Sequence, residues 1–157
     1  MSVKIRKMRS EDYAASMQIL DKWNMAPVAP SATLQNPERS ELDIEHSFVA
    51  ERDGVIVGVS SYIVHSPELA ETASLAVDPS CQGLGLGYQL QLARLREMQA
   101  KGIRKVHTET DREDTIAWYM RKFGYVRVGT NPKKHDFSLA DVDEWTVLQL
   151  DLDTYQP

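Results

Sequence analysis

The stretch that decides the fold is Leu75-Ala76-Val77-Asp78-Pro79-Ser80-Cys81-Gln82-Gly83-Leu84-Gly85-Leu86-Gly87. Its first part predicts a strand that stops at Asp78-Pro79, because proline cannot donate to a sheet ladder. An amphipathic run from Leu86 then predicts a long helix. A glycine-rich turn that opens a helix leaves backbone N–H groups unpaired, and the helix dipole adds partial positive charge. The turn is therefore predicted to bind a phosphate or pyrophosphate.

Other interpretations of the glycine turn fit it less well. A P-loop needs Lys-Ser/Thr after its last glycine, whereas Gly87 is followed by Tyr88-Gln89. A dinucleotide fingerprint has the spacing G-x-G-x-x-G in a first βαβ unit, but this turn reads G-x-G-x-G and lies in mid-chain. A flexible connection without a ligand needs only one or two glycines, and it ranks below a phosphate site.

The pattern Gln82-x-x-Gly85-x-Gly87, preceded by Leu75-x-Val77-x-Pro79, resembles the acetyl-CoA loop of the GNAT N-acetyltransferases. Two further segments resemble the same family. The first, 5–12, is similar to its opening strand and the start of its first helix, and the second, 117–125, to its late helix ending in Gly-Phe/Tyr. Together the three segments span nearly the whole chain in the expected order.

The resemblance implies an α+β fold: a mixed, mostly antiparallel central sheet with one splayed parallel strand pair and helices on both faces. It also implies acetyl-CoA as co-substrate and no metal. In such a loop, the pyrophosphate is held by Gln82 and by the N–H groups of Gly83, Leu84, Gly85, Leu86, Gly87 and Tyr88. The main chain of Leu75, Ala76 and Val77 pairs with pantetheine, while the side chains of Leu75 and Val77 belong to the core.

Local patterns predict the elements of a single domain, 1–157. Asp53-Gly54 between two β-prone runs is a strong hairpin signal. The strand 103–110 follows the strand 71–77 through one helix, which predicts a parallel pair. We expect strands at 3–5, 46–52, 55–64, 71–77, 103–110, 125–129 and 145–152, and helices from an N-cap at Ser10 to Trp23, at 86–101 before Gly102, and from Glu113 or Asp114 to Lys122 before Gly124. Loops are expected at 24–45, with a short helix at 37–42, and at 131–143.

Composition limits the class of protein. The hydrophobic fraction of 42% is ordinary for a globular domain, and the net charge of -5 argues against a nucleic-acid or membrane-surface binder. One cysteine, Cys81, excludes an internal disulfide. No signal peptide or membrane-length apolar run is present, so we expect a cytoplasmic protein. The four histidines are far apart in sequence, and no metal site is expected.

Acetyl transfer to an amine requires positioning and removal of a proton from the ammonium group. Glu71 lies eleven residues before Gln82, where histone-type members of the family place their glutamate base. A solvated carboxylate at a strand end is the equally weighted alternative. Glu109 and His107 are reserve candidates.

The family's usual general acid is a tyrosine four residues before the glycine that ends the late helix. Met120 occupies that position here, and Tyr119 is one residue earlier. One residue is about 100° of rotation on a helix. Tyr119 is therefore a candidate acid if the helix shifts locally, and otherwise an aromatic residue of the core or of the cofactor contact.

These observations favour an acetyl-CoA-dependent N-acetyltransferase that acetylates a primary amine, preferably of a small metabolite, by direct attack in a ternary complex. The segments 27–45 and 131–143 look long enough to enclose an acceptor. The first alternative is acetylation of a protein lysine or N-terminus. The second is a non-catalytic acyl-CoA-binding regulatory domain. Family members often pair through sheet edges, so a homodimer is a further expectation.

Overall fold

The computed structural model describes residues 3–23, 25, 42–132 and 143–156. Most of the two loops expected at 24–45 and 131–143 lies outside these residues, as does nearly all of the short helix expected at 37–42. The strands are β1 Val3–Lys7, β2 Ser47–Arg52, β3 Val55–Ser66, β4 Leu69–Val77, β5 Lys105–Thr110, β6 Val126–Pro132 and β7 Glu144–Asp151.

These strands form one seven-stranded sheet in the order β1-β2-β3-β4-β5-β7-β6. Every neighbouring pair is antiparallel except β4 and β5, which are parallel. The mixed, mostly antiparallel sheet predicted from the sequence is therefore confirmed.

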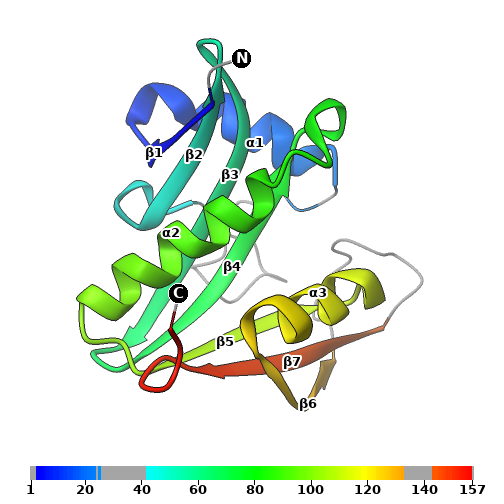
Figure 1. Ribbon diagram of the computed structural model, residues 1–157. Helices are drawn as coiled ribbons and strands as arrows, with labels where there is room; N and C mark the ends of the chain where they lie inside the picture. The colour runs from blue at the N-terminus through cyan, green and yellow to red at the C-terminus, as the bar shows by residue number, and fades with distance from the viewer. Residues whose placement is uncertain (1–2, 24, 26–41, 133–142, 157) are drawn as a thin grey trace, which may run out of the picture.

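The parallel pair separates after a short contact. Its register runs only from Leu69–Lys105 to Glu71–His107, although β4 continues to Val77. Figure 1 shows the two strands diverging from this point. The splayed pair expected from the family resemblance is confirmed. Beyond Glu71, this edge of β4 has no neighbouring strand among the described residues.

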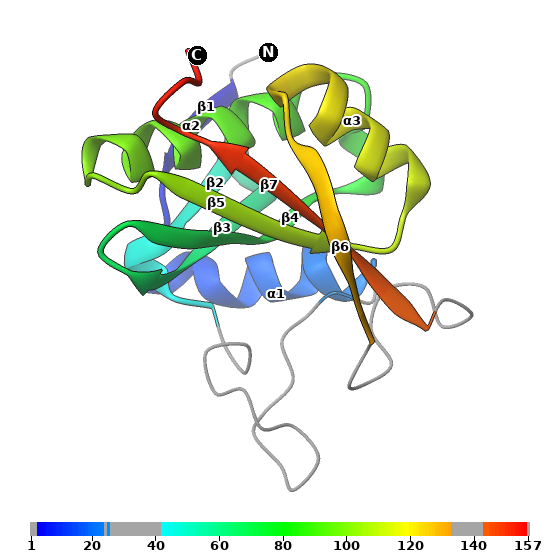
Figure 2. The same cartoon turned by 90° about the horizontal axis from the view of Figure 1, so that it is seen from below.

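Helices cover both faces of the sheet. The described residues form three α-helices, which are α1 Tyr13–Asp21, α2 Leu86–Ala100 and α3 Glu113–Phe123. Figure 2 shows α1 on one face and α2 with α3 on the other. Buried apolar side chains fill both interfaces, for example Leu20 and Val59 under α1, and Leu95 and Val106 on the α2–α3 side.

The glycine turns predicted from the sequence have the required conformation. Asp53 and Gly54 both have positive φ, 52° and 83°, as the tight turn between β2 and β3 demands. Gly124 has a φ of 80° and caps α3. Gly102 likewise follows α2 with a φ of 88°.

The start of the first helix differs from the prediction. Ser10 does not cap α1; it begins a short 3₁₀ helix, η1 Ser10–Asp12, and α1 begins at Tyr13. The Asp12 carboxylate accepts hydrogen bonds from Arg6 Nη1 at 2.7 Å and from the Arg9 backbone N–H at 2.8 Å. This ion pair ties the turn to β1, so the chain makes one tight turn before the helix. Helix α1 also ends at Asp21, before Trp23.

Several strand ends are also displaced from the predicted ones. β3 extends to Ser66 and β4 begins at Leu69, because the turn between them is confined to Pro67 and Glu68. β6 continues through Asn131 to Pro132, where a loop was expected. The longer hairpin between β3 and β4 places His65 near Glu71, which matters for the site.

Candidate active site

The glycine loop lies exposed at the amino end of α2. Gly83 and Gly85 have positive φ values of 82° and 76°, and a Cβ at either position would meet nothing within 4 Å. Gly85 is the N-cap of α2, and among the described residues no side chain caps the helix. The first N–H groups of α2 therefore remain available for an anion. Along the loop, exposed residues are Gln82, Gly83, Leu84, Gly85 and Tyr88, whereas Leu86 is buried and Gly87 half-buried.

Side chains fasten the loop to the end of β4. The Asp78 carboxylate accepts hydrogen bonds from Lys22 Nζ at 2.7 Å and from the Ser80 N–H at 3.0 Å. The Lys22 bond, with those from Ser80, lowers the pKa of Asp78 to about 2. Gln82 Nε2 donates to the Val77 carbonyl at 3.0 Å. The loop thus has fixed ends and an exposed centre.

The N–H and C=O groups of successive β4 residues point alternately toward the neighbouring strand β3 and toward the open edge. The Asp78 N–H donates to the Val57 carbonyl, so in the antiparallel register Ala76 also pairs with β3. The N–H and C=O groups of Leu75 and Val77 then face the side where β5 has separated. The Val77 carbonyl already accepts from Gln82 and from Trp23 Nε1. Both side chains pack in the core, as expected.

Glu71 lies where the parallel strands begin to separate. It is only 5% exposed, and its Oε1 lies 3.0 Å from His65 Nε2. It is therefore a buried, partnered carboxylate and not a solvated one at a strand end. His107 pairs with Glu71 in register, and its Nε2 lies 3.0 Å from Gln149 Oε1. Glu109, further along β5, accepts a hydrogen bond from Asn131.

Tyr119, and not Met120, faces the interior from α3. Tyr119 is 4% exposed and Met120 is 37% exposed. The Tyr119 hydroxyl accepts a hydrogen bond from Arg94 Nη2 at 2.8 Å. Nη1 of the same guanidinium donates to the Ser74 carbonyl of β4, also at 2.8 Å. One side chain thus holds the Tyr119 hydroxyl beside β4, just beyond the separation point.

Glu71 and Tyr119 belong to opposite faces of the sheet. Thr72 points to the α3 side, because its hydroxyl lies 3.3 Å from that of the buried Tyr125. Successive side chains on a strand point to opposite faces. Glu71 therefore points to the face of α1, and the two candidates flank the gap between β4 and β5 from both sides.

Sequence reasoning missed two residues of this region. His65 was assigned to a turn, although the hairpin around Pro67 places it across from the start of β4. Arg94 was not considered, although it lies four residues from both Leu90 and Met98, on the face of α2 that is buried. A charged residue in phase with a buried apolar stripe was the signal that could have identified it.

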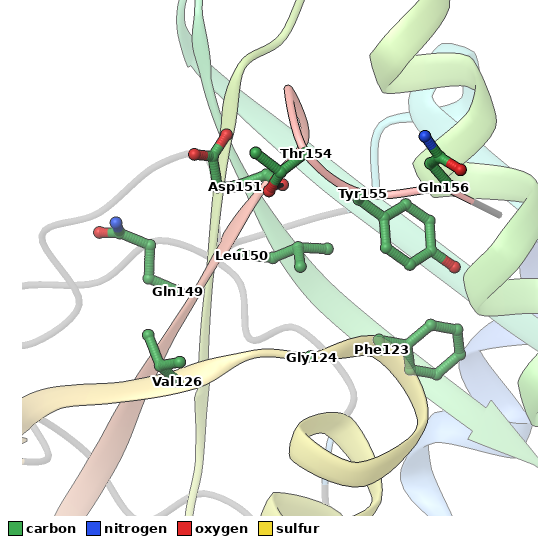
Figure 3. Close-up of a pocket in the computed structure, with 9 residues that line it drawn as sticks. All are labelled: Phe123, Gly124, Val126, Gln149, Leu150, Asp151, Thr154, Tyr155 and Gln156. Atoms are coloured by element: carbon green, nitrogen blue, oxygen red, sulfur yellow. Dashed lines mark hydrogen bonds between the residues drawn. The ribbon is translucent and has the colours of Figure 1, made fainter.

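A hollow of about 420 Å³ lies away from these residues, between the end of α3 and the end of β7. Figure 3 shows the rings of Phe123 and Tyr155 on one side of it and Gln149 with Val126 on the other. None of the site residues predicted from the sequence lines the hollow. Phe123 does connect it to the glycine loop, because its ring stacks on Tyr88 at 5.3 Å.

The part of the chain that the structure describes has neither a metal-binding cluster nor a helix that could span a membrane. Residues 3–23, 25, 42–132 and 143–156 contain no group of three or more His, Cys, Asp or Glu side chains that could hold a metal ion. Within the same ranges, no helix combines the length and apolar character needed to cross a bilayer.

Comparison with known sequences gives relatives over part of the chain. A mycothiol acetyltransferase of Amycolatopsis mediterranei is 33% identical over 103 residues, which are 59% of this chain and 34% of that protein. One from Thermomonospora curvata is 39% identical over 70 residues, 45% of this chain and 24% of that protein. The chain thus spans about a third or less of the length of these curated relatives.

Solved structures of similar fold cover almost the whole chain. Ard1 from Thermoplasma volcanium has a TM-score of 0.74 at 18% identity and covers 96% of this chain and 98% of its own. The structure of yncA from Salmonella typhimurium with its cofactor acetyl-CoA has a TM-score of 0.73 at 20% identity, and the match covers 100% of this chain and 98% of that one. At these identities the likeness shows the fold alone.

The family model described as the acetyltransferase (GNAT) family matches residues 8–125. This range holds the glycine loop, the splayed strands β4 and β5, and helix α3 with Tyr119. The chain belongs to the GNAT acetyltransferase family.

Proposed function

We propose that the chain is an acetyl-CoA-dependent N-acetyltransferase that acetylates a primary amine by direct attack in a ternary complex. One observation supports this most strongly: the uncapped amino end of α2 adjoins the unpaired edge of β4. An anion site next to an open strand edge suits a ligand with a diphosphate at one end and amide groups along its length.

The residues present fit acetyl-CoA. The N–H groups of 83–88 would hold the pyrophosphate, with Gln82 holding the loop against β4. The main-chain groups of Leu75 and the N–H of Val77, which face the open edge, would pair with pantetheine, since the Val77 carbonyl already accepts two hydrogen bonds. Bound acetyl-CoA supplies an activated thioester, so much of the remaining work is positioning.

Glu71 is the proposed general base. An amine with a lysine-like pKa of about 10.4 is almost wholly protonated at neutral pH, so its proton must be removed before attack. Glu71 lies at the separation point on the face opposite Tyr119, and His65 holds its carboxylate in place. An amine that enters from the α1 face would meet Glu71 before it reaches the gap between the strands.

Tyr119 is the proposed general acid for the departing thiolate. It is buried, and its hydroxyl lies beside β4 on the face opposite Glu71. Base and acid on opposite sides of the gap suit an attack from one face and departure of the leaving group toward the other.

A small-molecule amine is the proposed acceptor class. The relatives named mycothiol acetyltransferase support this choice, and the net charge of -5 favours a cationic acceptor. Acetylation of a protein lysine or N-terminus is the alternative within enzymes. We further propose that the exposed edge strand β6, with Val126 and Val128 on its surface, pairs in a homodimer, which size-exclusion chromatography with light scattering would test.

The experiment that tests the function measures thiol release from acetyl-CoA with a library of primary amines, together with acetyl-CoA binding by calorimetry. Release of one thiol per acetylated amine supports the proposal. Binding of acetyl-CoA without turnover over the whole library contradicts it and identifies a non-catalytic acyl-CoA-binding domain. If the chain neither binds acetyl-CoA nor turns it over, both functions are rejected.

A further inference from the structure

Arg94 is a fully buried cation under α2. Its Nη1 donates to the carbonyls of Ser61 and Ser74 at 2.8 Å each, and its Nε donates to Gln91 Oε1 at 2.5 Å. Its Nη2 donates to the Tyr119 hydroxyl at 2.8 Å. Among the described residues, no carboxylate lies within salt-bridge distance of this guanidinium.

A buried charge without a counter-ion is costly, and arginine cannot discharge it by losing a proton. Two main-chain carbonyls and a glutamine accept three of its four hydrogen bonds, and these partners are neutral. The fourth partner, the Tyr119 hydroxyl, is the one that can carry negative charge. The positive charge of the guanidinium can therefore stabilise a negative charge on the Tyr119 oxygen.

The Tyr119 hydroxyl has a hydrogen of its own to donate. In the part of the chain that the structure describes, Arg94 is its one hydrogen-bond partner, and Arg94 is the donor. The oxygen is thus fixed in position while its O–H stays available. Because Arg94 also binds Ser74, this O–H is held close to β4 at the start of the open edge.

We propose that Arg94 is a positioning residue that makes Tyr119 an effective acid. The inference rests on the proposed acetyl transfer. When the tetrahedral intermediate collapses, the C–S bond breaks and its electron pair goes to sulfur. The Tyr119 O–H gives its proton to that sulfur, and the tyrosinate formed is stabilised by the Arg94 cation. The amine nitrogen gives up two protons, one from the ammonium to Glu71 before attack and one after the C–N bond has formed. One of them replaces, through solvent, the proton that Tyr119 gave to sulfur, and the other is released to solvent.

A double-mutant cycle tests the coupling in the full chain. Tyr119→Phe is expected to lower kcat about 100-fold, the low end for a general acid. Arg94→Lys is expected to lower kcat about tenfold, with the KM for acetyl-CoA within twofold of wild type. In the Tyr119→Phe background, Arg94→Lys is expected to change kcat by less than twofold, because Arg94 then has no acid to position. If the kcat loss of the double variant instead equals the product of the losses of the two single variants, the proposal is overturned.

Tyr125→Phe is the matched control for damage to the buried network. Tyr125 is equally buried, and its hydroxyl accepts from Gln91 at 2.9 Å on the other side of the same network. It is expected to keep kcat within threefold; a loss as large as that of Arg94→Lys overturns the proposal. Arg94→Met replaces Arg94→Lys if the latter does not fold, and failure of both to fold rejects a positioning role. Wild-type turnover is measured first. If the wild type shows no turnover, the proposed function has failed, and the result says nothing against the role of Arg94 in particular.

Discussion

Glu71 of β4 and His107 of β5 form the last register pair before the two parallel strands separate. The point of separation therefore carries two titratable side chains on adjacent strands, and His65 adds a third within 3.0 Å of Glu71. On the opposite face, Arg94 holds Tyr119 beside β4. The separation point thus has candidate proton-transfer groups on both faces of the sheet.

Glu71→Gln is expected to lower kcat/KM for the amine about 100-fold, because the base that deprotonates the ammonium is lost. The pH–rate profile should also lose the limb that the carboxylate produces. His65→Gln is the matched variant, since its amide can still hold the carboxylate, and a smaller loss is expected. An unchanged rate and limb in Glu71→Gln would dismiss the glutamate as base.

Gly85→Trp is expected to weaken acetyl-CoA binding by more than about tenfold, or about 1.4 kcal/mol. The large side chain would stand at the uncapped amino end of α2, where the pyrophosphate is proposed to bind. Calorimetry on the folded variant measures the affinity. Gly54→Trp is the control, because Gly54 is also an exposed glycine of positive φ, in the turn between β2 and β3. Equal affinity in both variants would contradict the site.

Asp78→Asn is expected to lower the free energy of unfolding by a contribution that wild type also loses at low pH. The carboxylate has a pKa of about 2 in the folded protein, below its ordinary value of 3.8. A lowered pKa stabilises the fold at a pH above the unfolded value, and this contribution is lost as pH falls from about 4 to 2. Melting temperatures at pH 6 and pH 3 would show a larger difference between wild type and Asp78→Asn at pH 6. A difference that does not shrink at pH 3 would contradict the assignment.

Gly58→Ala is expected to destabilise the protein by about 1–3 kcal/mol. A Cβ at Gly58 would lie 2.9 Å from Leu90 Cδ1 and 3.2 Å from Ala50 Cβ, where α2 crosses β3. Gly129→Ala on β6 is the control, because a Cβ there meets nothing within 4 Å. Chemical denaturation measures both, and equal stability of the two variants would show that the crossing relaxes freely.

Much of the fold was accessible from sequence because local chemistry dictates it. Asp53-Gly54 predicts a tight hairpin, and Gly83, Gly85 and Gly87 before an apolar-faced helix predict the phosphate loop. Both are local features: the hairpin is found where expected, and the glycine turn precedes α2 as expected, while its binding of a phosphate stays a prediction. The parallel β4–β5 pair also followed, since one helix joins two strands.

What could not be predicted depends on side-chain contacts between different elements. The cap at Ser10 was wrong because Arg6 on β1 binds Asp12 and forms a tight turn first. The burial of Glu71 depends on where the β3–β4 turn begins, since this sets the position of His65. Tyr119 is in helical phase with the buried Ile116 and Phe123, but the hydrogen bond of its hydroxyl to Arg94, twenty-five residues away, does not follow from that spacing. None of these pairings follows from the periodicity of a single helix or strand.

The most direct measurement is an ¹⁵N–¹H NMR titration with coenzyme A that follows individual backbone amides. We expect the largest shifts at Gly83, Gly85 and Gly87, with Gly54 and Gly129 unmoved as internal references. Amides of 83–88 that stay in place while coenzyme A binds elsewhere, or fails to bind, would contradict the proposed diphosphate site and the acetyl transfer that depends on it.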